Sequence, residues 1–316
     1  MRLYRHEADL PSDVRGAVLT LGNFDGVHLG HQAVIAEALK IARAAGRPLG
    51  VLTFEPHTKA FFRPDLMPFR LTPLRVKLHA LEALGVDYVV ALAFDEKLAS
   101  VSAEAFAANV LSGALGISHA VAGGNFRYGH KHAGTMETLA AAGLEHGFGV
   151  TRVAPVSAAD GTVYSATAIR KFIADGDLRR AAMLLGRPFE IDGRVITGDK
   201  RGRELGFPTA NLKITEYMRA AYGIYAIRAL VDRPGDSTWI DGVANLGIRP
   251  MWRTPEPMLE AHLFDFSEDI YGQVLRVRLI ERLRPEAKFD TIEGLIEQVD
   301  RDKIAAREAL LATPGP

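Results

Sequence analysis

The chain of 316 residues is long for one hydrophobic core, so two domains are expected. Hydrophobic residues make up 48% and charged residues 24%, a composition that excludes a wholly disordered chain. Lys plus Arg equals Asp plus Glu at 38 each, so no global field draws the protein to nucleic acid or to an anionic membrane. We therefore expect neither as a partner, and expect any bound anion to be held by local geometry.

The absence of cysteine excludes disulfides, thiolate nucleophiles and Cys-ligated metals, and fits a reducing compartment. The longest apolar runs, such as residues 86–94, fall far short of the ~20 residues that cross a bilayer. Residues 1–7 lack the apolar stretch of a signal peptide. These features predict a cytoplasmic protein that does not enter a membrane.

In the first half of the chain, short apolar runs alternate with longer segments of helical periodicity. This alternation predicts crossover units and a doubly wound parallel sheet, an α/β fold. The expected strands are 17–21, 49–54, 86–94, 119–122 and 149–153, and the expected helices are 31–45, 73–84, 103–115 and 135–146.

Two short helices, 167–174 and 178–185, are expected next, and they close at Gly186-Arg187-Pro188. There the apolar period changes to two, which is typical of strands. The expected strands are 189–197, 223–231, 239–246, 258–266 and 274–283, followed by a helix at 289–311. We therefore predict an N-terminal domain, 1–186, and a C-terminal domain, 187–316, that is an antiparallel β-barrel with a closing helix.

The strongest motif is residues 22–31, Gly-Asn-Phe-Asp-Gly-Val-His-Leu-Gly-His, at the junction of the first strand and first helix. Its glycines permit close backbone approach, and a helix N-terminus attracts phosphate. His28 and His31 are suited to donate hydrogen bonds to phosphate oxygens. Neither a Walker sequence nor G-x-G-x-x-G occurs, so the phosphate site is of another kind.

This motif resembles the H-x-G-H nucleotidyltransferases and, more specifically, the bifunctional riboflavin kinase/FMN adenylyltransferase family of bacterial type. The resemblance implies a nucleotidyltransferase-like domain in which the histidines act in catalysis and contact the nucleotide. The residues that it assigns to ATP here are Gly22, Asn23, Phe24, Asp25, His28 and His31. On the residues alone, a structural metal pair or a purely structural glycine-rich turn remains open.

Three other segments resemble the same family. Residues 53–57, Thr-Phe-Glu-Pro-His, follow the second strand. Residues 121–129 end the fourth strand and resemble the flavin-side loop, which implies that Asn125, Phe126 and Arg127 bind flavin, with Asn125 at a position that is often Asp. The third segment, 164–170, precedes a helix and resembles the motif that holds the leaving pyrophosphate.

In that third segment the resemblance assigns Ser165, Thr167 and Arg170 to the phosphates. Ala166 and Ala168 replace a commonly hydroxylated and a commonly basic residue of the family. Losing one cation near a triphosphate removes ~1–3 kcal/mol of charge-assisted hydrogen bonding, so slower adenylyl transfer is one expectation. The alternative for Ser165 is an ordinary helix N-cap.

In the predicted barrel, the loop 197–206 carries three glycines and three cations, a plausible anion cradle, although its composition also suits a solvated hairpin. It leads into Phe207-Pro208-Thr209-Ala210-Asn211 and resembles riboflavin kinase. The resemblance places the ATP phosphates against Gly198, Lys200, Arg203, Gly206 and Thr209. It also assigns Mg²⁺ to Thr209 and Asn211, whose oxygens suit this hard cation.

Glu260 lies in a strand whose alternation sends Leu259, Ala261 and Leu263 to the opposite face. It aligns with the family's catalytic Glu, which implies a general base for the ribityl 5′-hydroxyl of riboflavin. The alternative is an exposed strand Glu without a function. Residues 245–250 also resemble a family motif and imply that Arg249 binds flavin.

The resemblance thus predicts a bifunctional enzyme that converts riboflavin to FMN and FMN to FAD, with ATP as co-substrate and Mg²⁺ as cofactor. One alternative keeps riboflavin kinase alone, with a weakened or inactive adenylyltransferase domain because of residues 164–170. Another is a flavin carrier without turnover, which has no use for a base such as Glu260 beside a metal site. The expected partners are small molecules only, and the expected assembly is a monomer or weak homo-oligomer.

Overall fold

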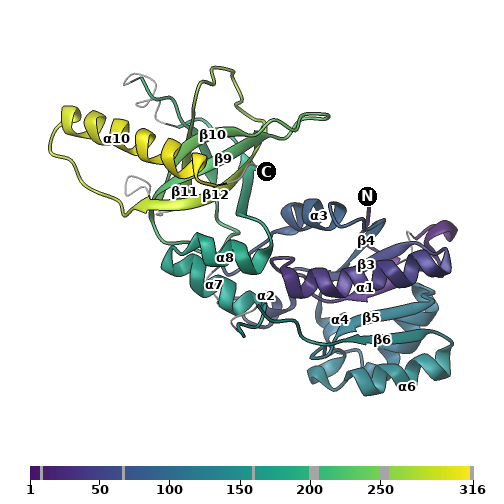
Figure 1. The fold of residues 1–316 in the computed structure, drawn as a ribbon. Helices are drawn as coiled ribbons and strands as arrows, with labels where there is room; N and C mark the ends of the chain where they lie inside the picture. The colour runs from purple at the N-terminus through teal and green to yellow at the C-terminus, as the bar shows by residue number, and fades with distance from the viewer. Residues whose placement is uncertain (8–9, 66–67, 159–160, 199–205, 249–255, 314–316) are drawn as a thin grey trace. The chain divides into compact units, whose positions relative to one another are not determined.

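The computed structural model describes residues 1–7, 10–65, 68–158, 161–198, 206–248 and 256–313 (Figure 1). The backbone divides into two compact units, Met1–Leu66 with Lys77–Ser165, and Met67–Val76 with Ala166–Pro316. Within the described part of the chain, no helix combines the length and apolar character needed to cross a membrane.

The first unit is built on a six-stranded sheet in which every pairing is parallel. Its strands are β1 Arg2–Tyr4, β2 Val18–Leu21, β3 Leu49–Glu55, β4 Tyr88–Ala93, β5 His119–Gly123 and β6 Gly149–Val153, in the order β1-β4-β3-β2-β5-β6. The predicted parallel sheet is therefore confirmed. The edge strand β1 was not predicted, because three residues, two of them exposed, carry no periodicity.

Helices cover both faces of this sheet, as Figure 1 shows for α1 and α6. Neighbouring strand residues explain this: Val18 packs with α1, whereas Leu19 packs with the helices of the other face. The helices are α1 Leu29–Ala45, α2 Thr58–Phe62, α3 Leu74–Glu82, α4 Glu96–Ala99, α5 Ala103–Ala105 and α6 Met136–His146, with 3-10 turns η2 Ser12–Val14 and η4 His130–His132 and the π-helical η3 Phe106–Ala114. Gly46 ends α1 in the left-handed conformation, with a φ of 62°, which glycine adopts without strain.

The carboxyl ends of β2 and β5 lie side by side at the centre of the sheet, because these two strands pair directly. From this pair the strand order runs outward in opposite directions, through β3 and β4 on one side and β6 on the other. Such a switch in strand order opens a crevice where α/β sheets bind ligands. The loops after β2 and β5, which carry two of the predicted motifs, therefore share this edge.

The second unit is an antiparallel barrel, as predicted. Its strands are β7 Phe189–Arg194, β8 Ala210–Lys213, β9 Gly223–Val231, β10 Ile240–Ile248, β11 Pro257–Leu263 and β12 Val274–Arg284, in the order β7-β12-β9-β10-β11-β8. Ile196, just after β7, forms an antiparallel bridge with Asn211 of β8, so the two edge strands of the sheet nearly meet. Large side chains such as Tyr225 and Leu259 alternate inward and are fully buried.

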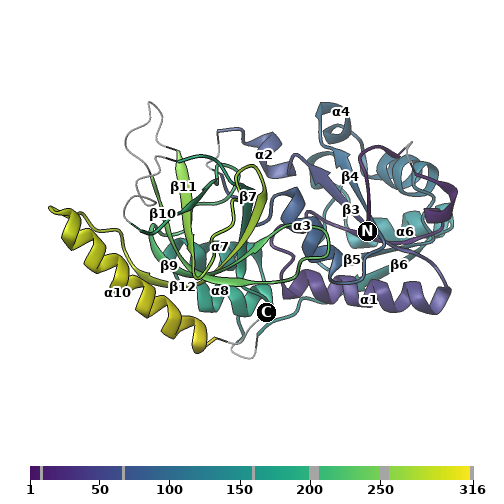
Figure 2. The same cartoon turned by 90° about the horizontal axis from the view of Figure 1, so that it is seen from above.

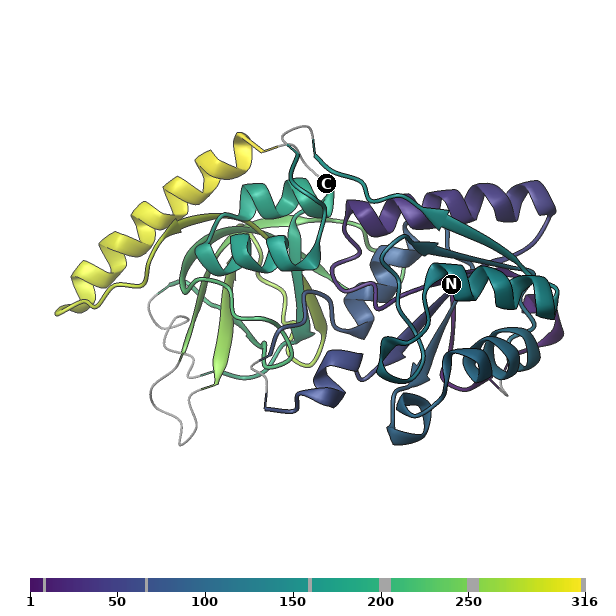
Figure 3. The same ribbon diagram turned by 90° about the horizontal axis from the view of Figure 1, so that it is seen from below.

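Three helices complete this unit. The predicted closing helix is α10 Ile292–Leu311, which lies along the outside of the barrel (Figure 2). Its Ala306 and Leu310 pack on Ala226 and Val243. The helices α7 Ala166–Asp175 and α8 Leu178–Leu185 contact each other, and α8 also contacts β7 and β12 (Figure 3, teal).

Two candidate active sites

The turn between β2 and α1 is unusually tight. Phe24 and Val27 have φ angles of 49° and 42°, and Gly26 has a φ of 87°. Positive φ is costly for side chains such as Phe and Val and persists only where the surroundings hold it. Both side chains are buried, and Gln32 of α1 donates from Nε2 to the Val27 carbonyl at 2.9 Å. Packing and hydrogen bonding therefore hold this turn in its tight conformation.

His28 and His31 lie together at the N-terminus of α1. His28 is the N-cap, only 7% exposed, and its Nδ1 accepts from the His31 backbone N–H at 3.4 Å. The two rings stack with centroids 3.7 Å apart. Because Nδ1 accepts, the proton of the neutral His28 ring is on Nε2, which makes Nε2 the donor nitrogen. Two imidazoles at a helix N-terminus form a suitable site for phosphate.

Glycine at position 30 lets another predicted segment approach this histidine pair. A Cβ on Gly30 would lie 3.1 Å from the His28 ring and 3.2 Å from the Tyr164 carbonyl oxygen. Both distances are tighter than ordinary contact. The segment that begins at Tyr164 thus starts beside the H-x-G-H motif, within the first unit.

A buried lysine is connected by hydrogen bonds to the motif of residues 22–31. Lys77 is 3% exposed, and its Nζ donates to the Thr53 hydroxyl at 3.2 Å. That hydroxyl donates to the Asn23 carbonyl at 3.1 Å, and the Asn23 amide donates to Thr58 Oγ1 at 3.2 Å. Lys77 was not among the residues predicted from the sequence. Its position is the feature that indicates a buried lysine, because this charged residue stands one helical turn before the buried Leu81, on the apolar face of α3.

The predicted flavin-side loop follows β5 at the same sheet edge. Asn125 and Arg127 are exposed, and Phe126 is half-buried with its ring stacked on Tyr128 at 5.8 Å. A Cβ on Gly123 would lie 3.3 Å from Asn125 Oδ1, so this amide folds back over the end of β5. The structure thus brings the two predicted loops to one edge of one sheet.

The three predicted pyrophosphate residues divide between the two units. Ser165 ends the first unit, and Thr167 and Arg170 lie in α7 of the second. Arg170 donates from Nε to the Phe69 carbonyl at 2.7 Å, and its guanidinium lies 5.3 Å from the centre of the Phe69 ring. Phe69 belongs to the chain segment that packs within the second unit.

In the barrel, three polar residues form one row across three neighbouring strands. Glu260 of β11 is the direct cross-strand partner of Asn211 in β8 and of Asn245 in β10. Direct partners share a face, with Cβ atoms ~5 Å apart. Leu259 and Ala261 are buried on the opposite face, so the alternation predicted for this strand is confirmed.

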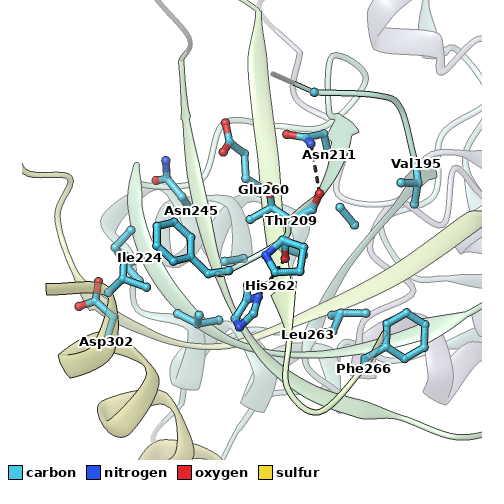
Figure 4. A pocket seen from close by; sticks show the side chains of 18 of the residues that line it. Val195, Thr209, Asn211, Ile224, Asn245, Glu260, His262, Leu263, Phe266 and Asp302 are labelled. Carbon is cyan, nitrogen blue, oxygen red and sulfur yellow. Dashed lines mark hydrogen bonds between the residues drawn. The ribbon is translucent and has the colours of Figure 1, made fainter. Parts of the chain in front are cut away.

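This row borders a cavity of about 950 Å³ (Figure 4). The other walls are the segment before β8, the residues Leu295, Val299 and Asp302 of α10, and the connections on either side of β12. Ligand cavities typically measure ~300–1,000 Å³, with apolar walls and a few polar groups. Four of the predicted residues line it together, namely Gly198, Thr209, Asn211 and Glu260.

The segment around Asn211 is closely packed. A Cβ on Gly198 would lie only 2.4 Å from Asn211 Nδ2, so no larger residue fits there without moving that amide. Asn211 is 3% exposed, and its Nδ2 donates to the Thr209 carbonyl at 3.4 Å. Glycine at 198 therefore lets the predicted phosphate loop approach the predicted metal ligand.

The donor chemistry at this place fits Mg²⁺. Thr209 has a hydroxyl, Asn211 an amide oxygen and Glu260, beside them, a carboxylate, and all three are oxygen donors of the kind that this hard cation prefers. Within the described ranges, no cluster of three or more His, Cys, Asp or Glu side chains is able to hold a metal ion. Mg²⁺ commonly keeps several waters and takes its remaining ligands from substrate phosphates, so a few protein oxygens are enough.

Three further polar residues of the cavity, Asn245, Asp302 and His262, were not predicted from the sequence. Asn245 has a buried Oδ1 without a hydrogen-bond partner, directly beside Glu260. Asp302 of α10 accepts two hydrogen bonds from Arg284 of β12, at 2.8 and 2.6 Å, which anchors the helical wall. His262, two residues after Glu260, has its Nδ1 2.9 Å from the Pro208 carbonyl oxygen. These contacts depend on strand pairing and packing, so spacing alone does not indicate them.

Of the remaining predicted residues, Gly206 is exposed with a φ of 86°. Lys200, Arg203 and Arg249 lie outside the described residues.

The fold and its sites define a two-domain phosphate-transfer enzyme, with a histidine pair in an α/β unit and a carboxylate beside a cavity in a barrel. The family model described as FAD synthetase matches residues 10–167, and the one described as riboflavin kinase matches residues 185–310. Each family model therefore covers one of the two candidate sites: the first covers the histidine pair, and the second covers the row around Glu260.

Similar proteins match almost the whole chain. The bifunctional riboflavin kinase/FMN adenylyltransferase of Escherichia coli K12 is 39% identical over 93% of this chain and 92% of its own, and that of Pseudomonas fluorescens is 40% identical over 100% and 99%. A crystal structure of a macrolide-efflux protein from Streptococcus pneumoniae is 30% identical, covers 96% of this chain and 98% of its own, and has a TM-score of 0.83. This chain belongs to the bifunctional riboflavin kinase/FMN adenylyltransferase family.

Proposed function

We infer that this chain phosphorylates riboflavin with ATP to give FMN, and then adenylylates FMN with a second ATP to give FAD and pyrophosphate. The observation that carries this inference is the presence of two separately built sites in one chain, each inside the stretch matched by its own family model. The match to FAD synthetase over 10–167 favours two activities over a kinase alone. We assign adenylyl transfer to residues 1–186 and phosphorylation to residues 187–316.

In the barrel, we assign the role of general base to Glu260. The ribityl 5′-oxygen of riboflavin attacks the γ-phosphorus of ATP, the bond from that phosphorus to the β–γ bridging oxygen breaks, and ADP leaves. Glu260 accepts the hydroxyl proton. Its place in a row with Asn211 and Asn245 supports this role, because the carboxylate lies beside the proposed phosphate and metal groups.

Thr209 and Asn211 are the residues proposed to hold Mg²⁺, which would neutralise phosphate charge during transfer. The close approach of Gly198 to Asn211 supports a phosphate loop at this point. We extend that loop to Lys200, Arg203 and Gly206, and we assign Arg249 to the flavin. These four residues keep the roles implied by the family resemblance.

In the α/β domain, catalysis needs no protein nucleophile. A phosphate oxygen of FMN attacks the α-phosphorus of ATP, the bond to the α–β bridging oxygen breaks, and pyrophosphate leaves. His28 and His31, at the helix N-terminus, stabilise the charge that develops on the phosphates. The remaining assignments are Gly22, Asn23, Phe24 and Asp25 to ATP, Ser165, Thr167 and Arg170 to pyrophosphate, and Asn125, Phe126 and Arg127 to FMN.

We further propose that the protein works in the cytoplasm, as a monomer or weak homo-oligomer, on small molecules and not on nucleic acid. Its balanced charge, 38 basic and 38 acidic residues, supports the last point.

A chromatographic time course with riboflavin, ATP and Mg²⁺ tests the proposed function. We expect FMN to rise first and then to give way to FAD. FMN that accumulates without FAD, even when FMN is the starting substrate, would refute adenylyl transfer and leave a riboflavin kinase.

A further inference from the structure

His262 is hydrogen-bonded to the carbonyl of Pro208, the residue before the proposed metal ligand Thr209. It lies on the same face of β11 as Glu260, because strand residues two apart share a face. Its Nδ1 lies 2.9 Å from the Pro208 carbonyl oxygen. A carbonyl oxygen only accepts hydrogen bonds, so Nδ1 must carry the proton and donate.

The segment that receives this hydrogen bond lies outside the strands. β8 begins at Ala210, so residues 207–209 are held by side chains instead of by a strand ladder. Lys303 of α10 lies 5.6 Å from the centre of the Phe207 ring, His262 holds Pro208, and Asn211 holds the Thr209 carbonyl. Fixing the Pro208 carbonyl fixes the plane of the peptide that joins it to Thr209.

We propose that His262 is a positioning residue of the kinase site: its Nδ1–H orients the Pro208–Thr209 peptide and so presents the Thr209 hydroxyl beside Asn211 and Glu260. The inference rests on the proposed kinase function of the barrel. In this role His262 touches neither substrate nor metal, and it acts through Thr209.

Two substitutions distinguish the effect of the Nδ1–H hydrogen bond from the effect of losing the imidazole ring. In His262→Asn the side-chain Nδ2 stands two bonds from Cβ, as Nδ1 does in histidine, so the donor is kept. The leucine side chain of His262→Leu is similar in size and shape to that of asparagine but has no hydrogen-bond donor. The matched pair therefore differs in the N–H that the proposal requires.

The test uses the full chain and three readouts. Hydrogen–deuterium exchange without any ligand follows the amides of Thr209, Ala210 and Asn211. Kinase assays give the Mg²⁺ concentration for half-maximal FMN formation and, separately, the KM for riboflavin. Conversion of FMN to FAD by the same preparation controls for folding and concentration.

For His262→Leu we expect faster exchange at these amides and a Mg²⁺ requirement about tenfold higher, the factor that corresponds to ~1.4 kcal/mol. The KM for riboflavin should stay near that of the wild type, and His262→Asn should behave like the wild type in all three readouts.

Three results would overturn the proposal: wild-type exchange and Mg²⁺ requirement in His262→Leu, equal impairment of both variants, or a riboflavin KM that rises together with the Mg²⁺ requirement. A wild-type protein that forms no FMN would instead refute the kinase function, and exchange would still decide whether His262 holds residues 207–209.

Discussion

Asn211 of β8 and Glu260 of β11 are direct cross-strand partners, so the proposed metal ligand and the proposed base stand side by side on one face of the barrel. The register that pairs them also pairs Glu260 with Asn245. A slip of one residue in β11 would turn Glu260 into the barrel interior and bring Leu259 or Ala261 out. The site is therefore fixed by the pairing of three strands.

The first prediction concerns Glu260. Glu260→Gln keeps the size of the side chain but removes the base, so FMN formation should fall by about 10²–10⁴-fold. Conversion of FMN to FAD should continue at the wild-type rate, because the histidine site lies in the other unit. Both rates are measured on one preparation, with Glu297→Gln on the exposed side of α10 as a charge-matched control. Loss of both activities in folded protein would argue against separate sites.

The histidine pair gives the converse prediction. His28→Ala combined with His31→Ala removes two phosphate donors, so FAD formation should fall by about 10²–10³-fold while FMN formation is spared. His146→Ala, at the end of α6, serves as the control. Chromatography from FMN plus ATP measures the first reaction, and from riboflavin plus ATP the second. An unchanged FAD yield in the double variant would remove the histidines from the mechanism.

Gly198→Ala tests the close approach of the phosphate loop to Asn211. The added methyl group would stand 2.4 Å from Asn211 Nδ2 and must displace that amide, so FMN formation should fall about tenfold or more. Gly235→Ala is the control, because its added Cβ meets nothing within 4 Å although its φ is 81°. Kinase activity of Gly198→Ala equal to that of Gly235→Ala would show that the position of the Asn211 amide is unimportant.

A pH-dependent prediction follows from Glu190 of β7. Burial raises the pKa of this carboxyl, but hydrogen bonds and charge from Arg276 and Arg278 outweigh burial and hold the pKa below its ordinary value of 4.5. A carboxyl with a lowered pKa stabilises the fold above the unfolded-state pKa, and this contribution is lost as the pH falls through the folded-state value. Glu190 therefore stabilises the barrel at neutral pH and ceases to do so in acid.

Glu190→Gln leaves two largely buried arginines without their carboxylate, so the barrel should lose about 3 kcal/mol at pH 7. Urea unfolding can be followed by tryptophan fluorescence, to which Trp239 contributes; the centre of its ring lies 3.8 Å from the Arg278 guanidinium carbon. The difference between wild type and variant should shrink as the pH falls below 4.5. A difference that is constant down to pH ~3 would contradict this account of Glu190.

Local periodicity predicted much of the architecture. Strands buried on both faces or with clear alternation, such as β3 and β11, were found near their predicted bounds, and the outward orientation of Glu260 followed from the period of two. The short strand β8 was not predicted, because four residues after a glycine-rich loop show too little periodicity.

The candidate site could be predicted from the sequence only in part. Residue types and the family resemblance named Thr209, Asn211 and Glu260, but the row that joins Asn211, Glu260 and Asn245 depends on pairing between strands far apart in sequence. The contacts of Lys77 with Thr53 and of His262 with Pro208 are likewise long-range. No local pattern specifies which distant backbone a buried lysine or a strand histidine meets.

The measurement that tests the central claim most directly follows labelled phosphorus from ATP into the flavins. With riboflavin and γ-labelled ATP, label should appear in FMN and then in FAD; with riboflavin and α-labelled ATP, FMN should stay unlabelled and FAD should carry the label. That pattern would establish phosphoryl transfer followed by adenylyl transfer. Label from α-labelled ATP that never reaches a flavin would contradict the claim that this chain performs both reactions.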